Sequence, residues 1–315
     1  MKRLKILTWH VHGSYLNTLA YVPHDWYIPI KPGRPERYSG RGSTFDGHKN
    51  LREVPATDVR RLNFDLILFQ TERNYHEDQY EILSEEQLRL PKIYLEHNVP
   101  RPHASDTRHP VDDPSLLLVH VTHYNRLMWD NGRTPTAVIE HSVMLDPAIT
   151  YQGHLEKGIT IVNDMRRRGR ITGYDVFEQV RESVPIDIAG MQSEEIGGLG
   201  DIPYRNLHQK IAQYRFLFSP IRYTSLPLAV VEALTIGMPV VALATTELPT
   251  VIESGKQGFV SCNVEEVVEQ MRFLLAHPDE AEYMGRQARK LAQERFSMPR
   301  FIHDWNTVFT LMTGS

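Results

Sequence analysis

The stretch SPIRYTSLPLAVVEALTIGMPVVAL, residues 219–243, contains the end of an apolar strand, a polar loop, a mostly apolar helix and a second apolar strand. Pro227 suits the first turn of a helix and Gly237 suits its end, so we expect a helix over 227–236. A strand, a helix and a strand joined by short loops form a unit of a parallel sheet. The stretch therefore predicts an α/β fold.

The same alternation of short apolar runs and longer amphipathic stretches recurs along the whole chain. In the first half it predicts strands at 5–9, 65–70, 92–97, 116–122 and 136–139. In the second half it predicts strands at 159–162, 186–189, 216–219, 239–244 and 258–261, with helices near 173–183, 205–215, 227–236, 263–276 and 278–295. We expect two doubly wound domains, residues 1–145 and 158–298, joined by a linker at 146–157.

The composition is that of a soluble globular protein. A length of 315 residues suffices for two domains, and 41% hydrophobic with 23% charged residues is an ordinary balance. The single cysteine, Cys262, cannot form an internal disulfide, and the apolar run near the amino terminus is shorter than that of a signal peptide. We therefore expect a cytoplasmic protein. The net charge of −4 argues against nucleic acid as a partner.

Polar residues follow several predicted strands, where ligands bind in open α/β sheets. These segments are His10–Ser14, Glu96–Asn98, His120–Asn125, Asp164–Arg170, Gly190–Ser193 and Ser219–Pro227. The sequence has no Gly-x-Gly-x-x-Gly after its first strand and no P-loop motif, so neither dehydrogenase nor P-loop chemistry is indicated. Glu232 stands out because a carboxylate on an apolar helix needs water or a hydrogen-bonding partner.

Residues 219–243, with ELPTVIESGKQGFV just after them, resemble the carboxyl-terminal domain of retaining, metal-independent glycosyltransferases of the GT-B fold, family 4. The resemblance covers most of the chain in the family's order: the loop His12–Gly13–Ser14, His97 in LPKIYLEHNVPR, the segment LHQKIAQYRFLFSP, and RFSMPRFIHDWNTVFTLM at the end. It implies two Rossmann-like domains facing across a cleft, with a last helix at 299–315 that packs back on the first domain.

The resemblance also implies roles for single residues. Glu232 would hold the nucleotide ribose, Arg166 would grip the donor diphosphate, Gly13 would let the backbone approach the donor, and His97 would lie beside the transferred sugar. We expect His97 and Arg166 to be catalytic. The expected donor-binding residues are Gly13, Arg166, Arg170, Thr224, Ser225, Leu226 and Glu232.

Two positions depart from the family pattern. The family has a glutamate eight residues before the position of Glu232, where this chain has Thr224. The family also has a lysine six residues after its arginine, where this chain has Thr172, with Arg170 close enough to substitute. Both departures fall on donor contacts. The resemblance implies that the absent glutamate helps to bind the transferred sugar, so with Thr224 in its place we expect an unusual donor sugar, a low rate or a loss of activity.

The chemistry of the arginines supports the same roles. A leaving diphosphate gains negative charge, which a guanidinium in a dry site stabilises, and the helix that begins near Pro227 offers free N–H groups to phosphate. A solvated basic turn is the alternative interpretation of the arginines at 166–170. The sequence contains no Asp-x-Asp, so we expect no cofactor metal and no GT-A enzyme. The histidine pairs His10/His12 and His120/His123 each lack a third ligand for zinc in sequence.

Residues 31–50 form a segment rich in Gly, Pro and Arg with a net charge of +3, which we do not expect to bury a hydrophobic face. A surface loop without function is one interpretation. The other is a contact with an acceptor or with lipid phosphate at the inner face of a membrane.

Together these features predict a retaining glycosyltransferase that transfers a sugar from a nucleoside diphosphate donor to the hydroxyl of a carbohydrate, lipid-linked or other acceptor. Two alternatives remain open: a catalytically silent GT-B subunit that binds a nucleotide or a partner, and a GT-B nucleotide-sugar epimerase. The sequence does not specify the base, sugar, acceptor, linkage or oligomeric state.

Overall fold

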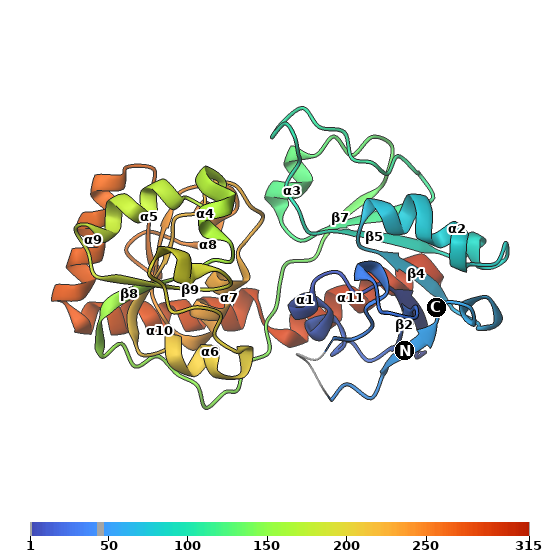
Figure 1. The fold of residues 1–315 in the computed structure, drawn as a ribbon, viewed down its shortest axis with the longest axis horizontal. Helices are drawn as coiled ribbons and strands as arrows, with labels where there is room; N and C mark the ends of the chain where they lie inside the picture. The colour runs from blue at the N-terminus through green and yellow to red at the C-terminus, as the bar shows by residue number, and fades with distance from the viewer. Residues whose placement is uncertain (1, 43–46, 315) are drawn as a thin grey trace. The chain divides into compact units, whose positions relative to one another are not determined.

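The computed structural model describes residues 2–42 and 47–314, which form two compact units (Figure 1). Unit 1 contains the described residues of 1–140 and 298–315, and unit 2 contains residues 141–297. Each unit is a parallel sheet with helices packed on it. This is the doubly wound α/β architecture that the sequence predicts.

Unit 1 has a seven-stranded sheet in the order β3-β2-β1-β4-β5-β6-β7. Its strands are β1 (Lys5–Thr8), β2 (Asp25–Ile30), β3 (Leu51–Pro55), β4 (Leu66–Phe69), β5 (Lys92–Glu96), β6 (Leu116–His120) and β7 (Thr136–Val138). All pairs in the sheet are parallel. β2 and β3 lie on one side of β1, whereas β4, β5, β6 and β7 follow one another on its other side. The loops after β1 and β4 therefore mark the switch point of unit 1.

The helices of unit 1 are α1 (Gly13–Leu19), α2 (Gln79–Ile82), α3 (His123–Met128) and α11 (Met298–Thr313), with a π-helical turn at Asn74–Asp78 before α2. The described residues of unit 1 also form 3₁₀ turns at Glu36–Tyr38, Val59–Arg61 and Gln87–Arg89. Apolar residues of α11, such as Phe301 and Trp305, share a core with α1 and alternate residues of the strands. The last helix therefore belongs to the first domain, as the resemblance implies.

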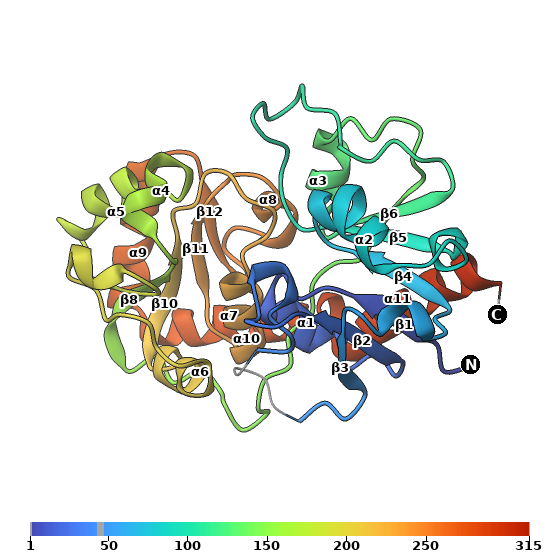
Figure 2. The same cartoon turned by 45° about the vertical axis from the view of Figure 1, so that its right-hand side comes forward.

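Unit 2 has a five-stranded sheet in the order β12-β11-β10-β8-β9. Its strands are β8 (Leu155–Ile161), β9 (Ile186–Ala189), β10 (Tyr214–Ser219), β11 (Val240–Leu243) and β12 (Gly258–Ser261). Figure 2 shows β8, β10, β11 and β12 running side by side. β9 lies on one side of β8, whereas β10, β11 and β12 follow one another on its other side. The loops after β8 and β10 therefore mark the switch point of unit 2.

The helices of unit 2 are α4 (Met165–Arg168), α5 (Tyr174–Arg181), α6 (Tyr204–Ile211), α7 (Leu228–Ile236), α8 (Leu248–Val251), α9 (Val264–Ala276) and α10 (Pro278–Arg295), with 3₁₀ turns at Gly169–Ile171 and Ser193–Ile196. Leu217 of β10 packs with α6 and α7, whereas Phe216 and Phe218 pack with α5 and α9. Successive strand residues therefore serve two separate cores, one on each face of the sheet.

Two strands of unit 1, β2 and β3, are absent from the sequence prediction. Each contains a proline, Pro29 in β2 and Pro55 at the end of β3, and proline is disfavoured inside a sheet. The edge position of β3 tolerates it. In unit 2, β8 begins at Leu155, within the range 146–157 that the sequence suggests as a linker.

Candidate functional site

The switch point of unit 2 brings together two loops that carry predicted donor-binding residues. Arg166 lies in the segment after β8, and Thr224 lies in the segment after the neighbouring strand β10. Hydrogen bonds join the two segments, because the backbone N–H groups of Arg222 and Tyr223 donate to the carbonyl of Ile171, at 3.0 and 3.3 Å. Both loops therefore form one rim at the carboxyl end of the sheet, where ligands of such folds bind.

Backbone strain also concentrates at this rim. Asp164 after β8, Gln192 after β9 and Thr246 after β11 adopt left-handed φ values of 53°, 61° and 52°. Such conformations cost about 1–3 kcal/mol each for residues other than glycine and cluster at functional sites. The loops that follow these three strands therefore maintain their geometry at a cost to stability.

Arg166 and Arg170 differ in their surroundings. Arg166 is exposed on α4, and the described part of the chain offers its guanidinium no hydrogen bond or ion pair. Arg170 donates to Asp175 at 2.6 Å, and Arg222 donates to both oxygens of the same carboxylate, at 2.5 and 2.8 Å. The hydrogen bonds from Arg222 hold the pKa of Asp175 below its ordinary value. Arg166 is thus the arginine of this pair that remains available to an anion.

Thr172 occupies the position where the resembled family has a lysine, and it faces inward. Its side chain is fully buried, and its hydroxyl lies 3.0 Å from the carbonyl oxygens of Met165 and Gly169. The adjacent Gly173 has a φ of +78°, and a Cβ there would lie 1.9 Å from the carbonyl oxygen of Pro220. The turn that contains the buried Thr172 is therefore packed tightly against the loop after β10.

Glu232 is buried on α7, so its carboxylate is not surrounded by water, which was one of the two environments that the sequence allowed for it. Its Oε1 lies 3.4 Å from Nε2 of His208 on α6, and both side chains are 6% exposed. Among the predicted sugar-binding residues just before α7, Thr224 is half-buried, whereas Ser225 and Leu226 are buried. The carbonyl of Ser225 accepts a hydrogen bond from Thr246 at 3.2 Å, which ties this segment to the loop after β11.

The amino end of α7 begins at Leu228 with Pro227 in the N-cap position, and no side chain caps it within the described residues. An uncapped helix start has backbone N–H groups that an anion can bind. The placement of a donor phosphate at the start of this helix stays a prediction.

At the switch point of unit 1, His97 follows β5 and contacts residues that follow β1 and β4. Its Nε2 lies 3.0 Å from Oε1 of Gln70, whose amide nitrogen donates to Thr8 Oγ1 and to the carbonyl of Trp9. His97 Nε2 is therefore the donor of this hydrogen bond. Gln70 is buried, so it fixes the orientation of the imidazole.

The rings of His12 and Tyr15 pack edge-on against His97, with centroids 4.5 and 4.7 Å away. Loss of water around the His12 ring lowers its pKa, which favours the neutral imidazole. Gly13, the predicted donor-approach residue, is the first residue of α1 directly after His12. Gly13 and His97 therefore both lie at the edge of the unit 1 sheet where the strands have their carboxyl ends.

The histidine pairs are not assembled into a metal centre in the parts of the chain that the structure describes. Within residues 2–42 and 47–314, no group of three or more His, Cys, Asp or Glu side chains could hold a metal ion. His10 Nδ1 lies 2.6 Å from the carbonyl of Gly40. His120 is buried, with Nε2 2.8 Å from Asn131 Oδ1, and burial lowers its pKa to about 4.

Three basic residues of the segment 31–50 pair with carboxylates, and residues 43–46 of the segment lie outside the described residues. Ion pairs join Lys31 to Glu81, Arg34 to Glu53, and Arg37 to both Glu77 and Asp78. Tyr38 is buried and donates to Asp78 at 2.9 Å. The segment thus buries one hydrophobic side chain, Tyr38, and the contacts of Tyr38 and Arg37 hold it against Asn74–Asp78.

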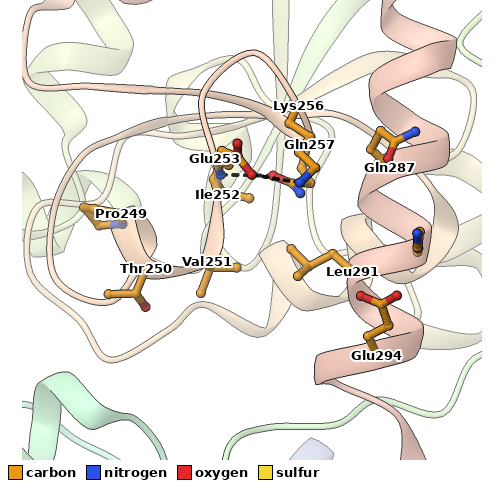
Figure 3. A pocket seen from close by; sticks show the side chains of 11 residues that line it. Pro249, Thr250, Val251, Ile252, Glu253, Lys256, Gln257, Gln287, Leu291 and Glu294 are labelled. Atoms are coloured by element: carbon orange, nitrogen blue, oxygen red, sulfur yellow. Dashed lines mark hydrogen bonds and ion pairs between the residues drawn. The ribbon is translucent and has the colours of Figure 1, made fainter.

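A cavity of about 390 Å³ lies elsewhere in unit 2, between the segment 249–257 and α10 (Figure 3). Lys256 and Glu253 on its wall form an ion pair at 2.9 Å. None of the predicted donor-binding residues lines it. The cavity therefore does not define the candidate site, which we place at the rim of strand ends.

The sequence prediction omitted several residues that the structure places at these sites. Gln70, Asp175, His208 and Arg222 are the residues concerned. A signal existed for His208, because it stands on the apolar face of α6 four residues after Tyr204 and three before Ile211. Asp175 and Arg222 gave no such signal, since their pairing joins residues 47 positions apart.

Comparison with known proteins gives a family match for part of the chain. Residues 191–291 match the family model of glycosyl transferases group 1. This segment runs from the end of β9 into α10 and includes Glu232. An 87-residue part of the chain is 28% identical to trehalose synthase of Pyrococcus horikoshii, covering 28% of this chain and 21% of that protein. The match thus spans about a fifth of the relative's length.

Solved structures resemble the chain over nearly its whole length. Sucrose-phosphate synthase from Thermosynechococcus elongatus has a TM-score of 0.72 and 13% identity, covering 99% of this chain and 100% of that chain. Anabaena HepE in complex with UDP has a TM-score of 0.70 and 13% identity, covering 98% and 100%. TarM of S. aureus, in a complex with fondaparinux, α-GlcNAc-glycerol and UDP, has a TM-score of 0.62 and 14% identity, covering 78% and 55%.

At these identities the likeness shows the fold, which is GT-B as predicted. The matched segment, residues 191–291, supports glycosyl transferases group 1 as the family of that part of the chain and, with it, a glycosyltransferase as the class of enzyme. Over the described residues, no helix is both long and apolar enough to cross a membrane.

Proposed function

We propose that this protein is a retaining, metal-independent glycosyltransferase that moves a sugar from a nucleoside diphosphate donor to an acceptor hydroxyl. The observation that carries the proposal is the rim at the switch point of unit 2. There Arg166, Thr224 and the start of α7 lie on the loops after β8 and β10, and Thr224 and α7 belong to the segment that matches the family model.

We assign the donor nucleotide to unit 2. Arg166 carries an exposed guanidinium that the described residues do not neutralise, so it can bind the diphosphate and stabilise the charge that develops as it leaves. The uncapped start of α7 offers N–H groups to the same anion. Glu232 supplies acceptor oxygens for the ribose, and Thr224, Ser225 and Leu226 contact the sugar. Arg170 has its own partner in Asp175, so we give it a supporting role in balancing charge.

His97 is our candidate for the transferred sugar, with Gly13 allowing the backbone of its loop to approach the donor. Gln70 holds the His97 ring, and His12 and Tyr15 pack against it, so the imidazole is held in one orientation for a ligand. A preorganised ring loses little conformational entropy on binding. The set requires no metal ion, because cationic and backbone donors neutralise the leaving diphosphate.

The similar structures guide the choice of ligands. HepE structures contain UDP, UDP-glucose, or UDP and glucose, and the TarM complex contains UDP with fondaparinux and α-GlcNAc-glycerol. UDP and its sugars are therefore the first donors to try, with a carbohydrate as the first acceptor. The expected contact of residues 31–50 with an anionic acceptor or a membrane surface is limited by the ion pairs of Lys31, Arg34 and Arg37.

A thermal-shift panel of UDP, GDP, ADP and their sugar conjugates tests the proposal. A ligand at one hundred times its dissociation constant adds about 2.7 kcal/mol of stability, which gives a clear shift of the melting temperature. We expect one base to be preferred and its sugar conjugates to bind. Absence of any shift at millimolar ligand would contradict a donor site in unit 2.

A second candidate is a catalytically silent subunit that binds a nucleotide or a partner. Two observations favour it: the family lysine position holds the buried Thr172, and the first family glutamate position holds the neutral Thr224. Product analysis with a bound sugar nucleotide separates the two candidates, because a silent subunit binds the donor without consuming it.

A further inference from the structure

Glu232 and His208 form a buried pair in unit 2. We propose that His208 is a positioning residue, which holds the Glu232 carboxylate in the orientation that receives the ribose hydroxyls of a nucleoside diphosphate. This inference rests on the proposed function, since it concerns the donor site proposed there.

The two residues come from adjacent helices. His208 lies on α6 and Glu232 lies on α7, with 3.4 Å between His208 Nε2 and Glu232 Oε1. The ring of Tyr204, one turn earlier on α6, packs edge-on against His208 with a centroid distance of 4.7 Å. This contact fixes the plane of the imidazole and directs Nε2 toward the carboxylate.

Burial makes the pair significant. Both side chains are 6% exposed, and a buried carboxylate is costly unless its oxygens receive hydrogen bonds. In the part of the chain that the structure describes, His208 is the one side chain within ion-pair distance of Glu232. A carboxylate has about four acceptor positions on its two oxygens. One histidine therefore leaves acceptor capacity for the two hydroxyls of a ribose.

The geometry is that of a pair ready for a further partner. His208 Nε2 is buried and makes no hydrogen bond of normal geometry, although Oε1 of Glu232 is 3.4 Å away. Hydrogen bonds at binding sites are often long in the absence of ligand and shorten in the complex. A small rotation of the Glu232 carboxylate toward a ribose would leave Oε1 within reach of His208 Nε2. In the absence of ligand, the same contact limits the rotamers that the Glu232 side chain adopts.

Two variants of His208 with neutral amide side chains distinguish a positioning role of this residue from a packing role. The amide nitrogen of glutamine reaches the position of histidine Nε2, whereas that of asparagine reaches the position of Nδ1. His208→Gln should therefore restore the contact with Glu232, and His208→Asn should not. A packing role would make the two variants alike in ligand affinity, whatever their melting temperatures.

The experiment measures the ribose contact itself. Dissociation constants are determined by calorimetry for UDP, GDP and ADP and for their 2′-deoxy and 3′-deoxy counterparts, using the full chain and each variant. For the preferred base, loss of a hydroxyl should weaken binding to the unaltered protein about tenfold or more, because the hydroxyl donates to a charged group. Glu232→Gln should remove most of this discrimination.

We expect His208→Gln to keep the discrimination and His208→Asn to reduce it about fivefold, the factor for one ordinary hydrogen bond. Discrimination unchanged in both histidine variants but lost in Glu232→Gln would overturn the role of His208 and leave the proposed function intact. Failure of all three ribonucleoside diphosphates to bind the unaltered protein would overturn both.

The unaltered protein offers a measurement that does not depend on folded variants. With ¹⁵N-labelled histidine, the Nε2 signal of His208 should shift on addition of the ribonucleotide and shift less with its deoxy counterpart. Equal shifts with both ligands would contradict a carboxylate held between His208 and the ribose.

Discussion

The hydroxyl of Thr172 donates to the carbonyl oxygen of Met165 at 3.0 Å, from a side chain with no exposed surface. At this position the resembled glycosyltransferases have a lysine for the donor diphosphate. The inward hydroxyl instead closes the turn between α4 and α5, so the position supports the loop that carries Arg166 and does not itself face a ligand.

Thr172→Val should lower the free energy of unfolding by about 1 kcal/mol, since it removes the hydroxyl and keeps the shape. Nucleoside diphosphate affinity should not change. Thr172→Lys should destabilise the protein more, because it places a charge in a fully buried position. Urea unfolding and calorimetry check both variants. If Thr172→Lys is as stable as the unaltered protein and binds the diphosphate more tightly, the position faces the donor after all.

Arg166→Ala should weaken binding of a nucleoside diphosphate about tenfold, with a smaller effect on the monophosphate, because the guanidinium is assigned to the diphosphate. Arg170→Ala is the matched control. Its guanidinium is already paired with Asp175, so its removal should change affinity less than threefold or so. Calorimetry with UDP and UMP, or with the preferred base, makes the comparison. Equal effects of the two substitutions would contradict the assignment.

Arg37→Gln should cost about 1–3 kcal/mol of stability, because the buried carboxylate of Asp78 loses a charged donor and, among the described residues, keeps the side chains of Tyr38 and Asn74 as donors. Arg34→Gln is the control, since Arg34 pairs with a carboxylate near the surface and should affect stability less. Neither variant should alter donor affinity. Denaturant unfolding decides between this fastening role and a solvated basic loop, for which both substitutions would be nearly neutral.

His120 should make the protein less stable as the pH falls from about 6.5 toward 4. Burial lowers its folded-state pKa to about 4, so the unfolded state binds more protons within this window and stability decreases with decreasing pH. The full effect is about 2–4 kcal/mol. His120→Gln keeps a donor toward Asn131 and removes the titration. Its unfolding free energy should therefore depend less on pH between 4 and 6.5, and identical pH profiles would exclude this role.

The sequence was sufficient to predict most of the fold because apolar runs and turn residues are local features. β9 and β12 match their predicted ranges. β2 and β3 were not predicted, and each contains a proline, a residue that is disfavoured inside a sheet. Residues that follow strands were also predictable, because parallel strands end at a common edge. Arg166, Thr224, Gly13 and His97 lie at such edges.

Side-chain direction and pairing were not predictable from the sequence. The spacing that relates Thr172 to a family lysine contains no information on whether the side chain points inward, and the proximity of Arg170 to Arg166 in sequence does not reveal Asp175 as its partner. The contact of Glu232 with His208 joins residues on separate helices. Such contacts depend on how helices pack, which a local pattern does not specify.

Metal-independent transfer with retention can be followed by NMR through the anomeric proton of a bound sugar nucleotide, in the presence of EDTA and a panel of carbohydrate acceptors. We expect the donor signal to decline, free nucleoside diphosphate to appear in equal amount, and the product to have the same anomeric configuration as the donor. A donor that binds but is never consumed, with any acceptor and with or without magnesium or manganese, would contradict this expectation.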